Sequence, residues 1–239
     1  MAFGTETRMA TARAGSAGQI DEGLRSYMLG IYNYMGLALA ITGLTAFVVA
    51  STPVLLSVIF GTPLKWVVML APLGFIFFLA ARINKMSVSS AQITFWAFAV
   101  VMGMSLASIF LVFTGESIAR VFFITAATFG ATSLYGYTTK RDLSGMGSFL
   151  FMGVIGIVIA MIVNMFLASS ALQFAISVIG VLVFTGLTAY DTQRIKSEYY
   201  VGDSGSLVAK KSIMGALSLY LNFINMFLFM LQLFGGSRE

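Results

Sequence analysis

The 239-residue sequence contains no cysteine and no histidine, and only 10% of its residues are charged. The absence of cysteine excludes disulfides, thiol nucleophiles and thiolate metal sites. The absence of histidine excludes imidazole ligands and histidine-based acid–base catalysis. A metal ion bound by this chain would therefore meet oxygen ligands, which favour a hard cation such as calcium, magnesium or manganese.

Apolar side chains, in contrast, make up 59% of the sequence and give it a mean hydropathy of +0.93. A helix needs about 20 apolar residues to cross the hydrocarbon core of a bilayer. Seven segments meet this requirement: residues 29–51, 55–81, 91–113, 117–137, 146–168, 171–193 and 211–235. The sequence therefore predicts an all-α membrane protein in which residues 25–236 form a single seven-helix transmembrane domain in the lipid bilayer. Residues 1–24 are small and polar, and we expect a flexible cytoplasmic tail.

The basic residues separate by side of the membrane. If the N-terminus is cytoplasmic, all of the 14 basic residues except Lys65, Arg120 and Arg238 fall in the tail or in cytoplasmic loops. This bias orients helices during insertion, so it predicts a cytoplasmic N-terminus and an external C-terminus for the multi-pass chain. The net charge of +5 is thus explained by topology, and we expect no nucleic-acid partner.

Small residues recur at helix-packing distance within the apolar segments. The pairs are Gly36 with Ala40, Ala126 with Gly130, and Gly153 with Gly156. Such residues allow helix backbones to approach closely in lipid, so we expect helix contacts at these positions.

The last apolar segment carries a stripe of polar residues on one helical face. Ser218, Asn222, Asn225 and Gln232 follow one another at spacings of four, three and seven residues. Lipid cannot satisfy their hydrogen-bonding groups, so this face must turn toward protein or water. We therefore expect the other helices to surround this one. Periodicity alone leaves open whether its polar face lines an internal pathway or forms a hydrogen-bonded helix contact.

Asp191, near the end of the sixth apolar segment, is the leading candidate for a functional residue, because a carboxylate at a membrane span is costly to keep. It lies on the same helical face as Thr188 and could point toward the polar stripe. A position level with Asn222 requires the sixth helix to start late or to extend through Lys196. The alternative is a boundary carboxylate that pairs with neighbouring Arg194.

Three stretches of the chain resemble a known family. They are Thr-Ala-Tyr-Asp-Thr-Gln-Arg-Ile-Lys at 188–196, Ala-Leu-Ser-Leu-Tyr-Leu-Asn-Phe-Ile-Asn at 216–225 with its Leu-Phe-Gly ending, and Arg-Ile-Asn-Lys-Met-Ser at 82–87. Over residues 25–236 the chain resembles the bacterial branch of the Bax inhibitor motif family. The resemblance implies seven helices around a central seventh helix, in the bacterial inner membrane. It also implies a pH-sensitive calcium leak channel, while other members are described as inhibitors of cell death or modulators of a membrane-bound ATP-dependent protease.

In that family, two facing aspartates close the pathway and an arginine of the second helix acts as a latch. Asp191 matches the first aspartate, whereas Asn222 stands at the position of the second. Arg82 is the best match to the latch, and Lys85 in the same turn is the alternative. The resemblance thus implies a pH-sensing gate made by Asp191 and Asn222.

Asn222 in place of a second aspartate changes the expected chemistry. Two carboxylates that share a site repel and hold a proton between them, and an amide removes this coupling. Calcium affinity also follows the number of charged ligands. We therefore expect a weak calcium site at Asp191, a less steep pH response than in relatives with both aspartates, and a pathway that continues past Ser218 and Asn225. Calcium would be the transported ion, and no cofactor is expected.

Two other classes of function compete with a channel. A non-conducting regulator could bind a membrane-bound ATP-dependent protease or another membrane protein through its tail and packed helices. An enzyme is disfavoured, because an intramembrane aspartyl protease needs two aspartates within the membrane and only Asp191 is available.

Overall fold

The structure is a computed structural model that describes the backbone of residues 3–236 and the side chains of residues 22–236. Its elements are α1 (Phe3–Ser51), α2 (Pro53–Phe60), α3 (Leu64–Arg82), the 3-10 turn η1 (Ile83–Lys85), α4 (Val88–Leu106), α5 (Ile109–Val112), α6 (Gly115–Thr138), α7 (Ser144–Leu167), α8 (Ser170–Ser197) and α9 (Gly205–Phe234). Within the described residues, seven helical spans are long and apolar enough to cross a membrane. The prediction of an all-α, seven-span membrane protein is therefore confirmed.

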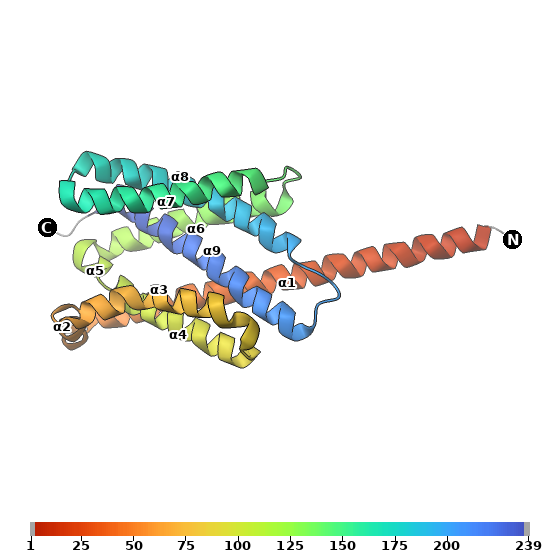
Figure 1. Ribbon diagram of the computed structural model, residues 1–239, viewed down its shortest axis with the longest axis horizontal. Coiled ribbons are helices and arrows are strands. Elements are labelled where there is room, and N and C mark those ends of the chain that lie inside the picture. The colour runs from red at the N-terminus through yellow and green to blue at the C-terminus, as the bar shows by residue number, and fades with distance from the viewer. Residues whose placement is uncertain (1–2, 237–239) are drawn as a thin grey trace.

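The first helix is longer than a membrane crossing requires. The backbone expected to form a flexible tail is helical from Phe3 and continues without a break into the first span. Figure 1 shows this part of α1 projecting from the bundle. No proline precedes Pro53, so nothing in the covalent chain interrupts the helix before that residue.

The second predicted span, 55–81, differs from the observed one. A bend at residues 61–63 separates the short helix α2 from α3, and the span runs from Leu64 to Lys85. Pro63 stands at the N-cap of α3, where its missing N–H costs no helical hydrogen bond. Apolar composition alone did not reveal this bend, because α2 is as apolar as the helices that cross the membrane.

Helix α9 occupies the centre of the bundle (Figure 1). It packs against α1, α4, α6 and α8. In its most apolar stretch 72% of the residues are buried, against 33% or less in every other described span. The prediction of a central seventh helix is confirmed.

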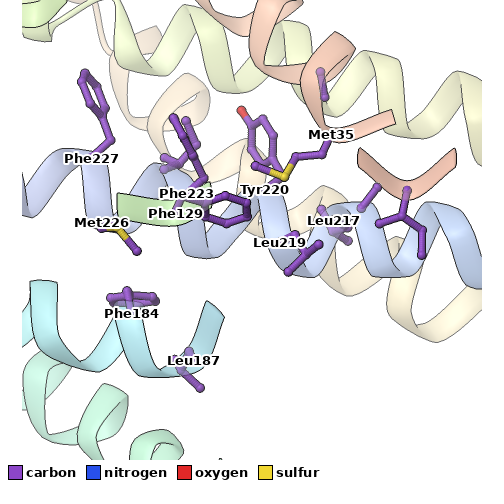
Figure 2. Close-up of a cluster of buried hydrophobic side chains, with 14 of the residues drawn as sticks. Met35, Phe129, Phe184, Leu187, Leu217, Leu219, Tyr220, Phe223, Met226 and Phe227 are labelled. Carbon is purple, nitrogen blue, oxygen red and sulfur yellow. The ribbon is translucent and has the colours of Figure 1, made fainter. Parts of the chain in front are cut away.

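Aromatic and sulfur-containing side chains of α9 form the core around this central helix. Figure 2 shows Tyr220, Phe223, Met226 and Phe227 along α9, with Phe129 beside them. The rings of Phe129 and Phe223 meet edge to face with centroids 5.6 Å apart. Between helices in lipid the hydrophobic effect supplies little driving force, so this close packing is what holds the helices together.

The glycines that permit close helix contacts are not the ones that spacing predicted. Gly36, Gly130 and Gly156 border open space, and only Gly153 of the predicted glycines is close to a neighbouring side chain. The tightest approach of a glycine to the backbone of another helix occurs at Gly136 of α6, where an added Cβ would lie 2.2 Å from the carbonyl oxygen of Ala189 in α8. The spacing of small residues identifies a helical face on which close packing is possible. It does not show whether that face is turned toward another helix.

One end of the bundle carries the α6–α7 and α8–α9 loops, on the side from which α1 projects (Figure 1). We call it the basic end, because Lys140, Arg141, Arg194, Lys196 and Lys211 lie in or beside these loops. Helix α9 ends on the opposite side of the bundle. The described ends of the chain therefore lie on opposite sides, as an odd number of spans requires.

Candidate functional site

Asp191 is buried in α8, and three side chains hold its carboxylate. Asn222 donates from Nδ2 to Oδ2 at 2.7 Å, and the Ser218 hydroxyl donates to the same oxygen at 2.9 Å. The Arg194 guanidinium lies 2.9 Å from Oδ1. Both carboxylate oxygens are thus engaged, which is the condition under which a buried charge is tolerated.

Helix periodicity and the packing of α8 on α9 create this arrangement. Asp191 and Arg194 are three residues apart on α8, and Ser218 and Asn222 are four apart on α9, so each pair shares a helical face. Helix α8 extends to Ser197, which fulfils the condition for Asp191 to lie level with Asn222. The two sequence-based alternatives coexist, because Asp191 faces the polar stripe and also pairs with Arg194.

A cavity of about 830 Å³ begins at Asp191 and follows the polar face of α9. All four residues of the polar stripe line it: Ser218, Asn222, Asn225 and Gln232. Its other walls come from α3, α7 and α8, and the parts contributed by α3 and α7 are uncharged. Asp191 and Arg194 are the charged groups among its lining residues. The polar stripe therefore lines a partly open cavity and, through Ser218 and Asn222, also forms a helix contact.

A cluster of hydrogen-bonded polar side chains surrounds Gln232 at the far end of the polar stripe. Oε1 of Gln232 accepts from Gln173 at 2.6 Å and from Ser177 at 2.8 Å. Asn164 of α7 donates in turn to Gln173 at 3.1 Å. The sequence pointed to Gln232 but not to the other three members of this cluster, because isolated polar residues on different helices show no periodic pattern that would link them.

The predicted latch, Arg82, does not take part in this cluster. It is exposed in the last turn of α3, and the described residues contain no hydrogen bond or ion pair between Arg82 and Asp191. Lys85, the alternative, is also exposed. The cation that contacts Asp191 is Arg194, so a latch role for Arg82 or Lys85 remains a prediction.

The oxygen atoms around Asp191 are the ligands that the site could offer to a cation. Among the described residues, no three acidic side chains gather to form a metal site. Asp191 would offer its carboxylate, and Ser218, Asn222 and Asn225 would add neutral oxygens. Asn225 lines the cavity and donates its amide N–H to the Leu221 carbonyl at 2.8 Å, and its side-chain oxygen accepts no hydrogen bond from the described residues. Such a donor set suits a hard cation bound weakly.

A seven-span bundle around a central helix, with one buried carboxylate facing a polar cavity, defines a polytopic helical membrane protein with an internal polar site. The family described as "Inhibitor of apoptosis-promoting Bax1" matches residues 24–239, and the chain belongs to this Bax inhibitor family. It is 50% identical to a protein of Rickettsia prowazekii, over 92% of this chain and 93% of the relative. It is also 44% identical to inner membrane protein YbhL of Escherichia coli, over 95% of this chain and 98% of the relative.

Proposed function

We propose that the protein is a calcium leak channel of the bacterial inner membrane, gated by the cluster of Asp191, Arg194 and Asn222. The family assignment supports this function, and the name of the similar Escherichia coli protein supports the membrane. The observation that carries the proposal is a buried carboxylate at one end of a cavity that a polar stripe lines for the length of several turns. An intramembrane ionisable group of this kind is a functional site by default.

The electrostatics of the cluster suggest how it would close the pathway. In the described state Arg194 neutralises Asp191, so an entering cation meets no free negative charge. Calcium would have to displace the guanidinium and bind the carboxylate together with the neutral oxygens of Ser218, Asn222 and Asn225. Protonation of Asp191 would remove the attraction for both Arg194 and calcium. In this proposal, Arg194 takes the gating role that the family resemblance implied for Arg82.

Calcium flux into liposomes containing the purified protein tests the proposal. Asp191→Asn should lower the flux or abolish its dependence on pH, because the titratable group of the gate is gone. Asn222→Asp should make the pH response steeper, since two carboxylates would then share the site. Glu116→Gln serves as a control, because Glu116 is exposed in the first turn of α6 and does not line the cavity. Flux that is unchanged in both site variants would reject the mechanism.

A non-conducting regulator that binds a membrane-bound protease is the second candidate. The projection of α1 beyond the bundle favours it, because the backbone of this part of the helix extends away from the other spans (Figure 1). Deletion of residues 1–24 should abolish co-purification with membrane proteases and leave calcium flux intact. Co-purification that survives the deletion would contradict this role for α1.

A further inference from the structure

A second cavity, of about 330 Å³, lies at the basic end between the α6–α7 loop and the last turns of α8. Lys140, Arg141 and Arg194 line it, together with the hydroxyl-bearing residues Ser144, Tyr190 and Ser197. Asp142 is the acidic residue in its wall. This excess of positive charge repels cations, so the cavity has different chemistry from the Asp191 site.

The α6–α7 loop that forms one wall is held in place by α8. Gln193 accepts from the Leu143 backbone N–H at 2.8 Å and donates to the Arg141 carbonyl at 2.8 Å. Oδ1 of Asp142 accepts from the backbone N–H of Ser144 at 2.9 Å and from its hydroxyl at 2.6 Å. The Gln193 amide therefore fixes the loop on both sides of Asp142, and the Asp142 carboxylate is hydrogen-bonded to Ser144. The cavity is consequently formed before any ligand arrives.

Arg194 lines both this cavity and the one that begins at Asp191. Its Nη2 contacts Asp191 at 2.9 Å and donates to the Ser218 hydroxyl at 3.1 Å, and its Nε lies 4.0 Å from Glu198. Within the part of the chain that the structure describes, Nη1 has no hydrogen-bond acceptor. The side chain is 43% exposed. A planar guanidinium with five donors can thus present one edge to an anion while its other edge holds the carboxylate.

We propose that this second cavity binds a phosphate-bearing anion, and that the anion competes with Asp191 for Arg194. A phosphate group has several acceptor oxygens and suits a site with two arginines and a lysine. Its charge would weaken the hold of Arg194 on Asp191, and by linkage a neutral residue 191 would strengthen anion binding. By weakening this ion pair the anion would open the pathway proposed above, and only this consequence rests on the proposed function. Anion binding and its competition with Asp191 do not.

Titration of the full-length protein with inorganic phosphate tests the site. The protein is placed in phosphatidylcholine nanodiscs and followed by calorimetry at constant ionic strength, since screening alone changes such affinities. Arg141→Gln should weaken phosphate binding about tenfold, the order expected for the loss of one charge-assisted contact. Lys210→Gln is the matched control, because it removes one positive charge at the same end but does not line the cavity. Equal phosphate affinities in the two variants would overturn the site.

The competition for Arg194 has its own test in the same assay. Asp191→Asn should tighten phosphate binding by about fivefold, because the guanidinium no longer faces a carboxylate. Asn222→Ala is the control, since it removes a neutral partner of Asp191 and leaves the ion pair. An unchanged phosphate affinity in Asp191→Asn would refute the competition. The readout involves no ion flux, so it remains decisive even if the protein does not conduct.

The source of the phosphate group is resolved by repeating the titration in nanodiscs that contain phosphatidylglycerol. Loss of inorganic phosphate binding in those discs would assign the cavity to a lipid headgroup. Retained binding would assign it to a soluble phosphate compound, and either result supports the proposed chemistry. Failure to bind inorganic phosphate, together with failure to retain phosphatidylglycerol in native mass spectrometry, would overturn it.

Discussion

Asn222 has a physical role at its position that a second carboxylate could not fill in the same way. Its amide donates to Asp191 at 2.7 Å, whereas an aspartate could donate only while it held a proton. The amide therefore stabilises ionised Asp191, and Arg194 completes the neutralisation. Removing the charged partner, Arg194, would leave a buried charge unbalanced, which is strongly destabilising. The group that faces Asp191 across the proposed gate is thus an amide, and the charge that balances Asp191 is a guanidinium.

Outside the membrane spans, Asp142 offers a simple titration experiment. Hydrogen bonds from the side chain and backbone of Ser144 lower the pKa of the Asp142 carboxyl. A lowered pKa stabilises the fold above the ordinary aspartate pKa of about 3.9, and this contribution is lost as the pH falls through the lowered value. Ser144→Ala should therefore raise the pKa of Asp142, as measured by carboxyl ¹³C NMR.

Ser148→Ala provides the control for this titration, because Ser148 lies one turn further along α7 and lines the other cavity. The pKa of Asp142 should not change in that variant. An Asp142 pKa that is the same in Ser144→Ala as in the unmodified protein would show that the serine hydroxyl does not stabilise the ionised form.

At the scale of helices, α8 is held in place by its two neighbours α6 and α9. Its backbone approaches α6 closely, and it makes polar contacts with both helices. Gly136 lets α6 approach α8, and Asp191 joins α8 to α9. In addition, a chain of hydrogen-bonded hydroxyls runs from Tyr32 of α1 through Ser133 of α6 to Thr192 of α8, with oxygen–oxygen distances of 2.6 and 2.9 Å. Interhelical hydrogen bonds of this kind add to packing in a medium where apolar surface drives little association.

The contact at Gly136 gives a stability prediction with a control on the same helix. In Gly136→Ala the new Cβ would lie 2.2 Å from a carbonyl oxygen, so α6 and α8 must move apart. Overpacking of this type costs about 1–3 kcal/mol. The thermal midpoint of the purified protein should fall clearly.

Gly130→Ala is the matched control, because nothing lies within 4 Å of an added Cβ at that position. Alanine favours a helix by about 0.5–1 kcal/mol over glycine, so this variant should be neutral or slightly more stable. Equal thermal midpoints for the two variants would show that α6 and α8 do not meet at Gly136.

On the scale of the whole molecule, seven spans place the described ends of the chain on opposite sides of the bundle (Figure 1). The position of the basic residues predicts which side is cytoplasmic. The sequence contains no cysteine, so single introduced cysteines can report the orientation without background. Lys140 at the basic end and Ser170 at the opposite end are both exposed and suit this purpose.

In intact spheroplasts, an impermeant maleimide should label Ser170→Cys and should label Lys140→Cys only after the membrane is permeabilised. The unmodified protein is the control for specificity, because it offers no thiol. The reverse pattern would invert the topology and would place the cavity beside the α6–α7 loop, with Arg194, on the outer side.

By itself, the sequence determined that the protein lies in a membrane, that it is all-helical, that it has seven spans and that its last helix is central. Long apolar runs and a polar stripe with helical spacing leave few other solutions in lipid. It also determined that Asp191 and Asn222 were candidates to meet. In each case the information is local, either in composition or in the periodicity of one helix.

Only the tertiary structure decided which helices turn toward one another and at what depth. In the structure Asp191 pairs with Arg194 and also contacts Asn222. The sequence had suggested these two contacts as alternatives. The tertiary structure also moved the close helix contacts from Gly130 to Gly136 and introduced the bend before α3. These features depend on how a helix is rotated and where its neighbours end, and spacing along one helix carries no information about either.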